Sequence, residues 1–306
     1  MCWRSKAQRK GPRVHILVFG YNGQVATDLR ALAAEDLKIT ALDRDAADLT
    51  DPAACTAAIA AHAPDAVINA AAYTAVDRAE EDEATAQIVN ADAPVAMAQA
   101  CAALDIPFVT ISTDYVFSGA GHVAWTPQDQ PDPQGAYGRT KLAGEQGVAH
   151  VGGRWAVLRT SWVFSAHGTN FVKTMLQLGA ERDALKVVSD QIGGPTGAAE
   201  IAAACVVIAR KLSQDADVAG IYHFSGAPAT SWADFARAIF AGAGLDCAVT
   251  DIPSSAYPTP AKRPLNSWIE CSATTATFGI PQPQWQNSLT AILTQLSQQQ
   301  NGTSSS

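Results

Sequence analysis

Short apolar runs alternate with alanine-rich stretches along the first half of the chain. Runs rich in β-branched residues predict buried strands at 14–19, 37–42, 65–71, 106–112 and 154–160. The stretches between them predict helices at 23–34, 52–62, 84–103 and 136–149. Because the strands are almost continuously apolar and alternate with helices, we expect a parallel sheet covered on both faces. Right-handed crossovers then give an α/β fold with a doubly wound, Rossmann-type sheet.

The pattern loosens after Thr160, where proline and glycine become frequent. Further helices are predicted at 196–212, 230–242 and 287–298. We interpret residues 14–160 as a dinucleotide-binding domain. Residues 161–296 are interpreted as mainly a second, smaller substrate-binding domain over the carboxyl edge of the sheet, with some segments returning to the first domain. A basic extension at 1–13 and a tail at 297–306 are expected to be disordered.

Composition and charge exclude several classes of protein. Hydrophobic residues make up 48% of the 306 residues and charged residues 16%, so the chain can bury a large core. The net charge of −8 disfavours a nucleic-acid-binding surface, and no apolar run approaches the length of a membrane span. The cysteines and histidines are scattered without metal-ligand spacing, which is typical of a cytoplasmic protein with no structural metal.

A glycine pair after the first strand indicates a nucleotide-binding turn. Gly20 and Gly23 lie where a strand ends and a helix begins, so a pyrophosphate could approach the amides at the helix N-terminus. The full dinucleotide fingerprint is absent, and such a turn also occurs for geometric reasons alone. Asp43 follows about twenty residues later, where an acid reaches the adenosine ribose, and Arg44 could accept a 2′-phosphate. NADPH and NADH are therefore both candidate cofactors.

Tyr137 and Lys141, in "GAYGRTKLAGE", carry the catalytic signal. Residues i and i+4 share a helix face, so the Lys141 ammonium is expected to lower the pKa of the Tyr137 phenol. Alone, such a spacing is more often an exposed surface pair. Here it follows the glycine turn, the ribose acid and Thr113, which ends a buried strand. That order favours an acid–base couple beside a nicotinamide.

Eight stretches of the chain together resemble the dTDP-4-dehydrorhamnose reductase family of the extended short-chain dehydrogenase/reductase superfamily. They are "GYNGQV", "NAAAYTAVDRAE", "STDYVFSG", "YGRTKLAGE", "LRTSWVF", "NFVKTML", "DQIGGPTGAAEIA" and "YPTPAKRPLNS". The similarity spans residues 14–295. It implies that the C4 ketone of dTDP-4-dehydro-6-deoxy-L-mannose is reduced to dTDP-L-rhamnose by hydride from NADPH or NADH.

The resemblance also implies roles for individual residues. Tyr137 would donate the proton to the C4 alkoxide, Lys141 would keep Tyr137 poised and hold the nicotinamide ribose, and Thr113 would bond the ketone oxygen. Asp114 and Trp162 match positions that contact the sugar nucleotide. The cofactor wall is matched by Gly23, Gln24, Val25, Asp43, Asp48, Leu49, Ala71, Ala72 and Thr74.

Three further side chains have candidate roles beside a simpler interpretation. Arg263, in "AKRP", is a candidate for the nucleotide diphosphate or a surface charge beside a proline turn. Some family members form a Mg²⁺-linked homodimer, and Asp28 and Glu200 are the candidates for this metal by position. Asp28 replaces the longer glutamate expected there, which argues against the metal. The acidic run at 78–84 is expected to be a solvated helix face.

Two other functions stay open at this point. The regulatory β subunit of methionine adenosyltransferase resembles the same family but acts as an NADP-binding partner protein, whereas intact Thr113, Tyr137 and Lys141 favour catalysis. A sibling reductase or epimerase of another 4-keto nucleotide sugar would share the fold. The expected partner is a dTDP-4-keto-6-deoxy-L-sugar in the cytoplasm, with neither nucleic acid nor a membrane.

Overall fold

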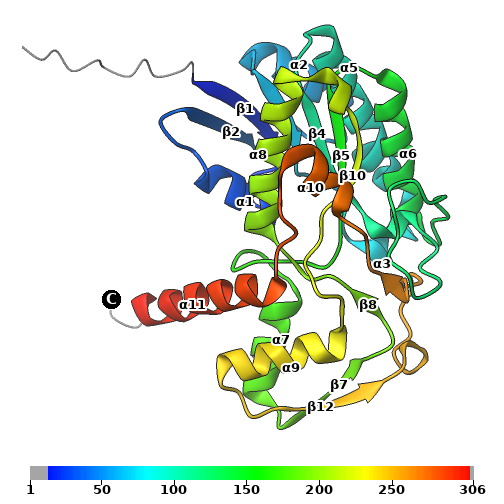
Figure 1. The fold of residues 1–306 in the computed structure, drawn as a ribbon, viewed down its shortest axis with the longest axis vertical. Coiled ribbons are helices and arrows are strands. Elements are labelled where there is room, and N and C mark those ends of the chain that lie inside the picture. Colours follow the sequence, from blue (N-terminus) through cyan, green and yellow to red (C-terminus); the bar gives the residue numbers. More distant parts are fainter. Residues whose placement is uncertain (1–12, 304–306) are drawn as a thin grey trace, which may run out of the picture.

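A central sheet of six parallel strands organises the protein, whose computed structural model describes residues 13–303 (Figure 1). The strand order is β10-β5-β4-β3-β1-β2. Strand bounds are β1 Val14–Phe19, β2 Leu37–Leu42, β3 Ala66–Asn69, β4 Phe108–Thr113, β5 Trp155–Thr160 and β10 Gly220–His223. Chain order reverses between β1 and β3, and ligands bind beyond such a switch point in doubly wound sheets. The predicted fold class is confirmed.

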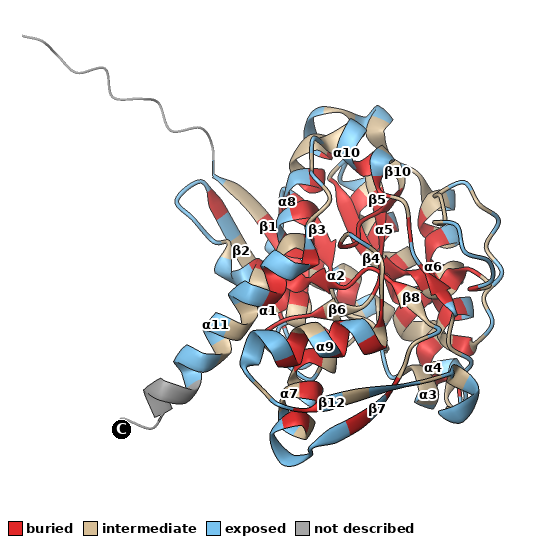
Figure 2. Ribbon diagram, turned by 60° about the horizontal axis from the view of Figure 1, so that its bottom comes forward, coloured by how far each residue is buried: buried red, intermediate tan, exposed pale blue. Residues whose placement is uncertain are grey.

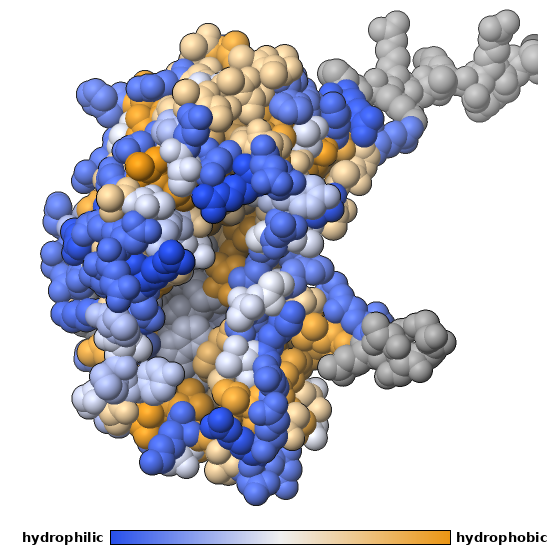
Figure 3. Space-filling view, turned by 180° about the vertical axis from the view of Figure 1, so that it is seen from behind, coloured by the Kyte–Doolittle hydropathy of each residue, from blue (hydrophilic) through white to orange (hydrophobic). Residues whose placement is uncertain are grey.

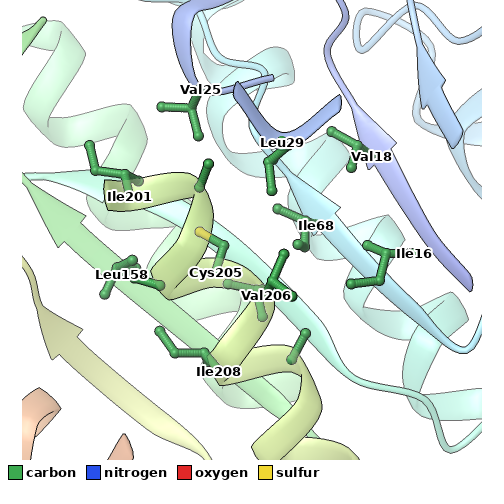
Figure 4. Packing of buried hydrophobic residues seen from close by; sticks show 14 of the residues in the cluster. Ile16, Val18, Val25, Leu29, Ile68, Leu158, Ile201, Cys205, Val206 and Ile208 are labelled. Carbon is green, nitrogen blue, oxygen red and sulfur yellow. The ribbon is translucent and has the colours of Figure 1, made fainter. Parts of the chain in front are cut away.

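Two layers of helices bury the faces of this sheet. On one face lie α1 (Gln24–Ala31) and α8 (Ala198–Gln214), and on the other lie α2 (Pro52–His62), α5 (Ala93–Ala103) and α6 (Ala136–Val151). Figure 4 shows how strand residues meet the α8 side of the core, with Ile16, Val18, Ile68 and Leu158 facing Ile201, Cys205 and Ile208. The β-branched strand residues and the small residues of α8 allow this close approach.

A smaller part of the molecule follows β5 and lies below the sheet in Figure 1. It contains α7 (Phe171–Glu181), the parallel pair β7 (Ala184–Val188) and β12 (Ala248–Ile252), α9 (Trp232–Ala243) and α11 (Trp285–Thr303). A separate apolar cluster holds these elements together. Buried residues are concentrated in the sheet and on the inward sides of the helices, while α11 projects outward with exposed residues (Figure 2). The division of the chain into domains stays a prediction.

Short elements complete the fold. The helical ones are α3 (Val76–Ala79), α4 (Glu83–Gln87), α10 (Ser272–Phe278), a π-helical turn at Ile88–Asp92, and 3₁₀ turns at Asp114–Val116, Ala216–Val218 and Ser254–Ala256. The extended ones are β6 (Val163–Phe164), β8 (Ile192–Gly193), β9 (Thr196–Gly197), β11 (Thr230–Ser231) and β13 (Asn266–Ser267). β6 pairs with β9, and β8 pairs with both β11 and β13. No helix within residues 13–303 is long and apolar enough to cross a membrane.

Two segments differ from the expected pattern. The helix expected at 84–103 is divided into α4, the π-helical turn and α5, and Pro94 stands in the first turn of α5. At the tail we expected disorder from residue 297, whereas α11 continues to Thr303. Leu289 anchors α11 in the core, and each further residue of an anchored helix adds one hydrogen bond. Residues 1–12 and 304–306, where disorder was also expected, lie outside the described residues.

Candidate active site

A pocket of about 480 Å³ opens beyond the carboxyl ends of β1, β2 and β3. At its base, Gly20 has φ of +110°, and a Cβ there would lie 3.4 Å from Ala26 and from the backbone of Ala71. Glycine is therefore required by conformation. Gly23 caps α1 without a side-chain hydrogen bond, so amides of the first turn stay free for an anion. Figure 3 shows the molecule hollowed between its two parts on the face opposite to Figure 1.

The predicted ribose acid and its neighbours line this pocket. Asp43 lies at the end of β2, and its Oδ1 accepts a hydrogen bond from Ala46 N at 2.9 Å. The Arg44 guanidinium is bound to the Asp48 carboxylate at 2.9 Å across the same rim. Hydrogen bonds from Thr50 and then Arg44 lower the pKa of Asp48, which keeps this carboxylate charged. Leu49, Ala71 and Ala72 complete the apolar wall.

Three predicted cofactor residues turn their side chains elsewhere. Gln24 Oε1 accepts hydrogen bonds from Ser165 Oγ and Asn170 Nδ2, which ties α1 to the segment before α7. Val25 is buried in the core, and Thr74 is exposed outside the pocket lining. Gln24 and Val25 can therefore offer a pyrophosphate only their main-chain amides at the α1 N-terminus.

Several residues that line the pocket were not predicted from the sequence as cofactor-binding residues. They are Tyr21, Asn22, Tyr73, Arg78 and Thr85. Tyr73 also packs in one apolar cluster with Tyr137, so the wall of the pocket reaches the predicted catalytic helix. Tyr73 is held by buried Asn90, whose Oδ1 accepts from Tyr73 N at 2.9 Å. A polar residue inside an otherwise apolar predicted helix indicates that Asn90 has a buried partner. The sequence could not identify this partner, because Tyr73 lies 17 residues away.

The structure brings together the three predicted catalytic residues. Thr113 ends β4, Tyr137 lies in the first turn of α6, and Lys141 lies one turn later. Thr113 and Lys141 are buried, and Tyr137 is half-buried. The nearby Thr113 hydroxyl acts to lower the phenol pKa of Tyr137. Lys141 Nζ donates to the main-chain oxygen of Ile111 on β4 at 2.6 Å.

Electrostatics at Tyr137 differ from the expectation. Burial and then the nearby Asp114 carboxylate raise the pKa of Tyr137 above its ordinary value, against the effect of the Thr113 hydroxyl. The Lys141 ammonium, which donates to Ile111, does not outweigh these two effects. The pKa of the phenol is therefore raised overall, where the sequence predicted a lowering by Lys141. Tyr137 is a neutral phenol at neutral pH, which is the form that can donate a proton.

Buried Asp114 lies next to this group. Thr113 Oγ1 donates to Asp114 Oδ1 at 3.1 Å, and Asp114 Oδ2 is buried without a hydrogen-bond partner among the described residues. Burial raises the pKa of Asp114 to about 6, against the effects of the nearby Ser267 and Thr113 hydroxyls. An unpaired buried oxygen is costly, and a substrate hydroxyl would satisfy it.

The two other predicted substrate residues lie at the junction of the two parts. Trp162 has φ of +50° and stacks on Trp232, with ring centroids 3.6 Å apart. Arg263 binds the Asp77 carboxylate of α3 at 2.6 Å, and its Nη1 is buried without a partner among the described residues. Arg263 thus ties the smaller part of the molecule to α3, and its Nη1 can donate to a further acceptor.

The acidic run at 78–84 does not form a merely solvated face. Glu80 Oε1 accepts a hydrogen bond from Ala136 N at 2.9 Å, at the start of α6. Glu83 makes two bonds to the Arg139 guanidinium at 2.9 and 2.8 Å. A carboxylate at a helix N-terminus satisfies a free amide and complements the helix dipole. Glu80, Glu81 and Glu83 are exposed, as expected, but the sequence showed no sign of these bonds because the partners lie 56 residues away.

Replacing Glu80 by alanine is expected to lower the free energy of unfolding by about 0.5–2 kcal/mol, because α6 loses its N-terminal acceptor. Urea unfolding measures this change. Glu81→Ala is the matched control, because Glu81 is the exposed neighbour in the same acidic run. Equal stability of the two variants would show that the Glu80 bond does not stabilise α6.

The two metal candidates already have protein partners. Asp28 Oδ1 lies 3.7 Å from His167 Nε2, and Glu200 accepts a hydrogen bond from Ser288 Oγ. Burial raises the pKa of Asp28, and the Glu200 carboxylate raises it further against the His167 effect. Among residues 13–303 no three His, Cys, Asp or Glu side chains converge on a point that could hold a metal. Asp28 and Glu200 therefore do not fit a Mg²⁺ site within one chain.

A tyrosine and a lysine on one helix, beside a nucleotide-binding turn in a doubly wound sheet, place the protein in the short-chain dehydrogenase/reductase class. Distant solved structures agree at the level of the fold. UDP-glucose 4-epimerase from Brucella ovis superposes with a TM-score of 0.73 at 17% identity, over 92% of this chain and 97% of that one.

Closer relatives define the family within this class. The family model for the RmlD substrate binding domain matches residues 14–298. A dTDP-4-dehydrorhamnose reductase of Sinorhizobium fredii is 44% identical, over 90% of this chain and 95% of that protein. The crystal structure of a dTDP-4-dehydrorhamnose reductase from Clostridium acetobutylicum superposes with a TM-score of 0.87 at 35% identity, over 93% of this chain and 100% of that one. The chain belongs to the dTDP-4-dehydrorhamnose reductase family.

Proposed function

We propose that this chain reduces the C4 ketone of dTDP-4-dehydro-6-deoxy-L-mannose to dTDP-L-rhamnose, with NADPH or NADH as the reductant. The observation that carries the proposal is the meeting of Thr113, a neutral Tyr137 and Lys141 next to a nucleotide pocket. Support comes from the 44% identical reductase and from a reductase of Bacillus anthracis solved in complex with NADP, which superposes with a TM-score of 0.86 at 32% identity.

The described pocket suits the adenosine half of the cofactor. Asp43 would hold the ribose, and a pyrophosphate would meet the amides that follow Gly20 and Gly23. Arg44 would reach a 2′-phosphate by leaving Asp48, and such an exposed ion pair contributes only about 0–1 kcal/mol. The bound nicotinamide would supply the hydride.

Side chains of the protein would bind the C4 ketone oxygen and protonate it. Thr113 would hydrogen-bond the ketone oxygen, and Tyr137 would protonate it as negative charge develops there. The tyrosinate that results is costly in this buried site, and the Lys141 ammonium one turn away would offset that charge. Asp114 Oδ2 would accept a hydrogen bond from a sugar hydroxyl.

The decisive experiment is an assay of reduced-cofactor oxidation with the dTDP-4-keto-L-sugar, run separately with NADPH and NADH. The stereochemistry of the product at C4, determined by NMR, separates dTDP-L-rhamnose from the product of a sibling enzyme. Tight cofactor binding without turnover of any keto-sugar would instead favour the non-catalytic alternative. A cytoplasmic location is part of the proposal, because the described cysteines are all free thiols.

The pH dependence of kcat/KM is expected to be bell-shaped, with a plateau between the pKa of Asp114 at about 6 and that of Lys141 at about 8. Below the plateau Asp114 is protonated, so its carboxylate can no longer accept a hydrogen bond from the sugar hydroxyl as an anion. Above the plateau the Lys141 ammonium loses its proton and its charge. His223 stays neutral throughout, because burial lowers its pKa to about 3. Asp114→Asn should remove only the acid limb. A wild-type profile without an alkaline limb would contradict the role of the ammonium.

A further inference from the structure

A buried ion pair lies directly behind the catalytic helix face. Glu145 follows Lys141 by one turn of α6, and Arg159 reaches it from β5, with Nη2 to Oε2 at 2.6 Å and Nε to Oε1 at 3.0 Å. Each side chain is only 2% exposed. Replacing such a pair with apolar residues is often neutral or stabilising, so stability alone explains it poorly. The burial of Glu145 and Arg159 therefore suggests that the pair serves the active site on α6.

The pair belongs to a polar row across three strands. Ser112, Arg159 and His223 occupy matching positions on β4, β5 and β10, one residue before the carboxyl edge at Thr113 and Thr160. Ser112 Oγ donates to Glu145 Oε1 at 2.5 Å. Arg159 Nη1 lies 3.4 Å from His223 Nε2, and His223 stays neutral. Glu145 thus accepts from Ser112 and Arg159 and lies one helical turn from a second cation, Lys141.

Strand β4 bonds two successive turns of α6, the one with Lys141 and the one with Glu145. Lys141 Nζ donates to the main-chain oxygen of Ile111, and Glu145 accepts from the next residue, Ser112. Tyr137, Lys141 and Glu145 lie on one helix face because they are spaced four residues apart. Any movement of Glu145 along or around the helix axis would therefore move the two catalytic side chains with it.

We propose that Glu145, fixed by Arg159 and Ser112, is a positioning residue that sets α6 against β4 and maintains the charged form of Lys141. This inference rests on the proposed function. The Glu145 carboxylate raises the pKa of Lys141 against the larger effect of burial, so the ammonium persists to a pH of about 8. Arg159 faces Glu145 from β5, and His223 on β10 contacts Arg159. On α6 itself Tyr137 precedes Lys141 by one turn, and Asp114 and Tyr115 lie next to Tyr137.

The test is Glu145→Gln, which keeps the shape of the side chain and removes its charge. We expect the alkaline limb of kcat/KM to move by about 1 to 2 pH units to lower pH. At pH 7 kcat/KM should then fall by about 2- to 10-fold, because Lys141 is less often protonated. Glu145→Gln leaves Arg159 unpaired, so the double variant Glu145→Gln/Arg159→Met is measured as well. Its limb should move in the same direction.

The matched control is Glu83→Gln, which breaks a different ion pair of α6, with Arg139, at an exposed position. Its pH profile should equal that of the wild type. An unshifted limb in the folded double variant, or an equal shift in Glu83→Gln, would overturn the positioning role.

Cofactor binding provides a readout that does not depend on turnover. The dissociation constant of NADPH, measured by fluorescence against pH, should show the same displaced limb in the Glu145 variants, because Lys141 is proposed to hold the ribose. A wild type that binds NADPH with an alkaline limb but leaves the keto-sugar unreduced would refute the proposed function and not the positioning role. Identical binding limbs in wild type and the double variant would refute the positioning role alone.

Discussion

Replacing Tyr137 by phenylalanine is expected to lower kcat by about 10²- to 10⁴-fold, the usual contribution of a positioned acid. The variant removes one oxygen atom, and the ring remains packed beside Tyr73 and Ala136. NADPH binding should therefore change little. Stability should stay close to that of the wild type, because only the hydroxyl of a half-buried side chain is removed. Single-turnover hydride transfer with the keto-sugar measures the step directly.

The neighbouring Tyr115 offers a control with the same chemistry. Its ring lies 5.5 Å from that of Tyr137 in an edge-on contact, and burial likewise raises its pKa. Tyr115→Phe should retain most of kcat, because Tyr115 follows the strand end and no catalytic role is proposed for it. If Tyr137→Phe kept full kcat, the proton would have to come from another group, and Asp114 would be the nearest candidate.

Local sequence patterns were sufficient to predict five of the six strands of the sheet and the pairing of Tyr137 with Lys141 on one helix face. The five predicted strands are confirmed, because short runs rich in apolar and β-branched residues are local signals. The sixth strand, β10, was not predicted. Its four residues, "GIYH", are too short for a periodic pattern, and its place beside β5 depends on a crossover more than 50 residues long. The i, i+4 spacing of Tyr137 and Lys141 was likewise readable without tertiary information.

The charges around the site could not be derived from spacing. Sequence shows that Lys141 shares a face with Tyr137, but only the fold shows that Ile111 accepts from its ammonium. Arg159 gave a usable signal, since a cation inside an otherwise buried strand requires a partner. That partner, Glu145, was identifiable only once α6 was placed over β4 and β5. Glu80 was missed for the same reason.

Replacing Lys141 by methionine is expected to cause the second large loss of activity. Lys141→Met keeps a long side chain but removes the ammonium, so both the compensation of the tyrosinate and the proposed bond to the ribose are lost. We expect kcat/KM to fall by at least about 10²-fold, comparable to the loss of a positioned acid, and the dissociation constant of NADPH to rise. Lys38→Met, at an exposed position on β2, is the control and should leave both quantities unchanged.

The double variant Tyr137→Phe/Lys141→Met decides whether the two side chains act as one unit. With no phenol to ionise, the ammonium has no tyrosinate to stabilise, so the second substitution should add little to the loss in kcat. Its remaining effect should be on cofactor binding, because the ribose contact is independent of Tyr137. If the two losses in kcat multiplied fully, Lys141 would serve the reaction through an interaction that does not involve Tyr137, and the proton-donating couple would have to be reassigned.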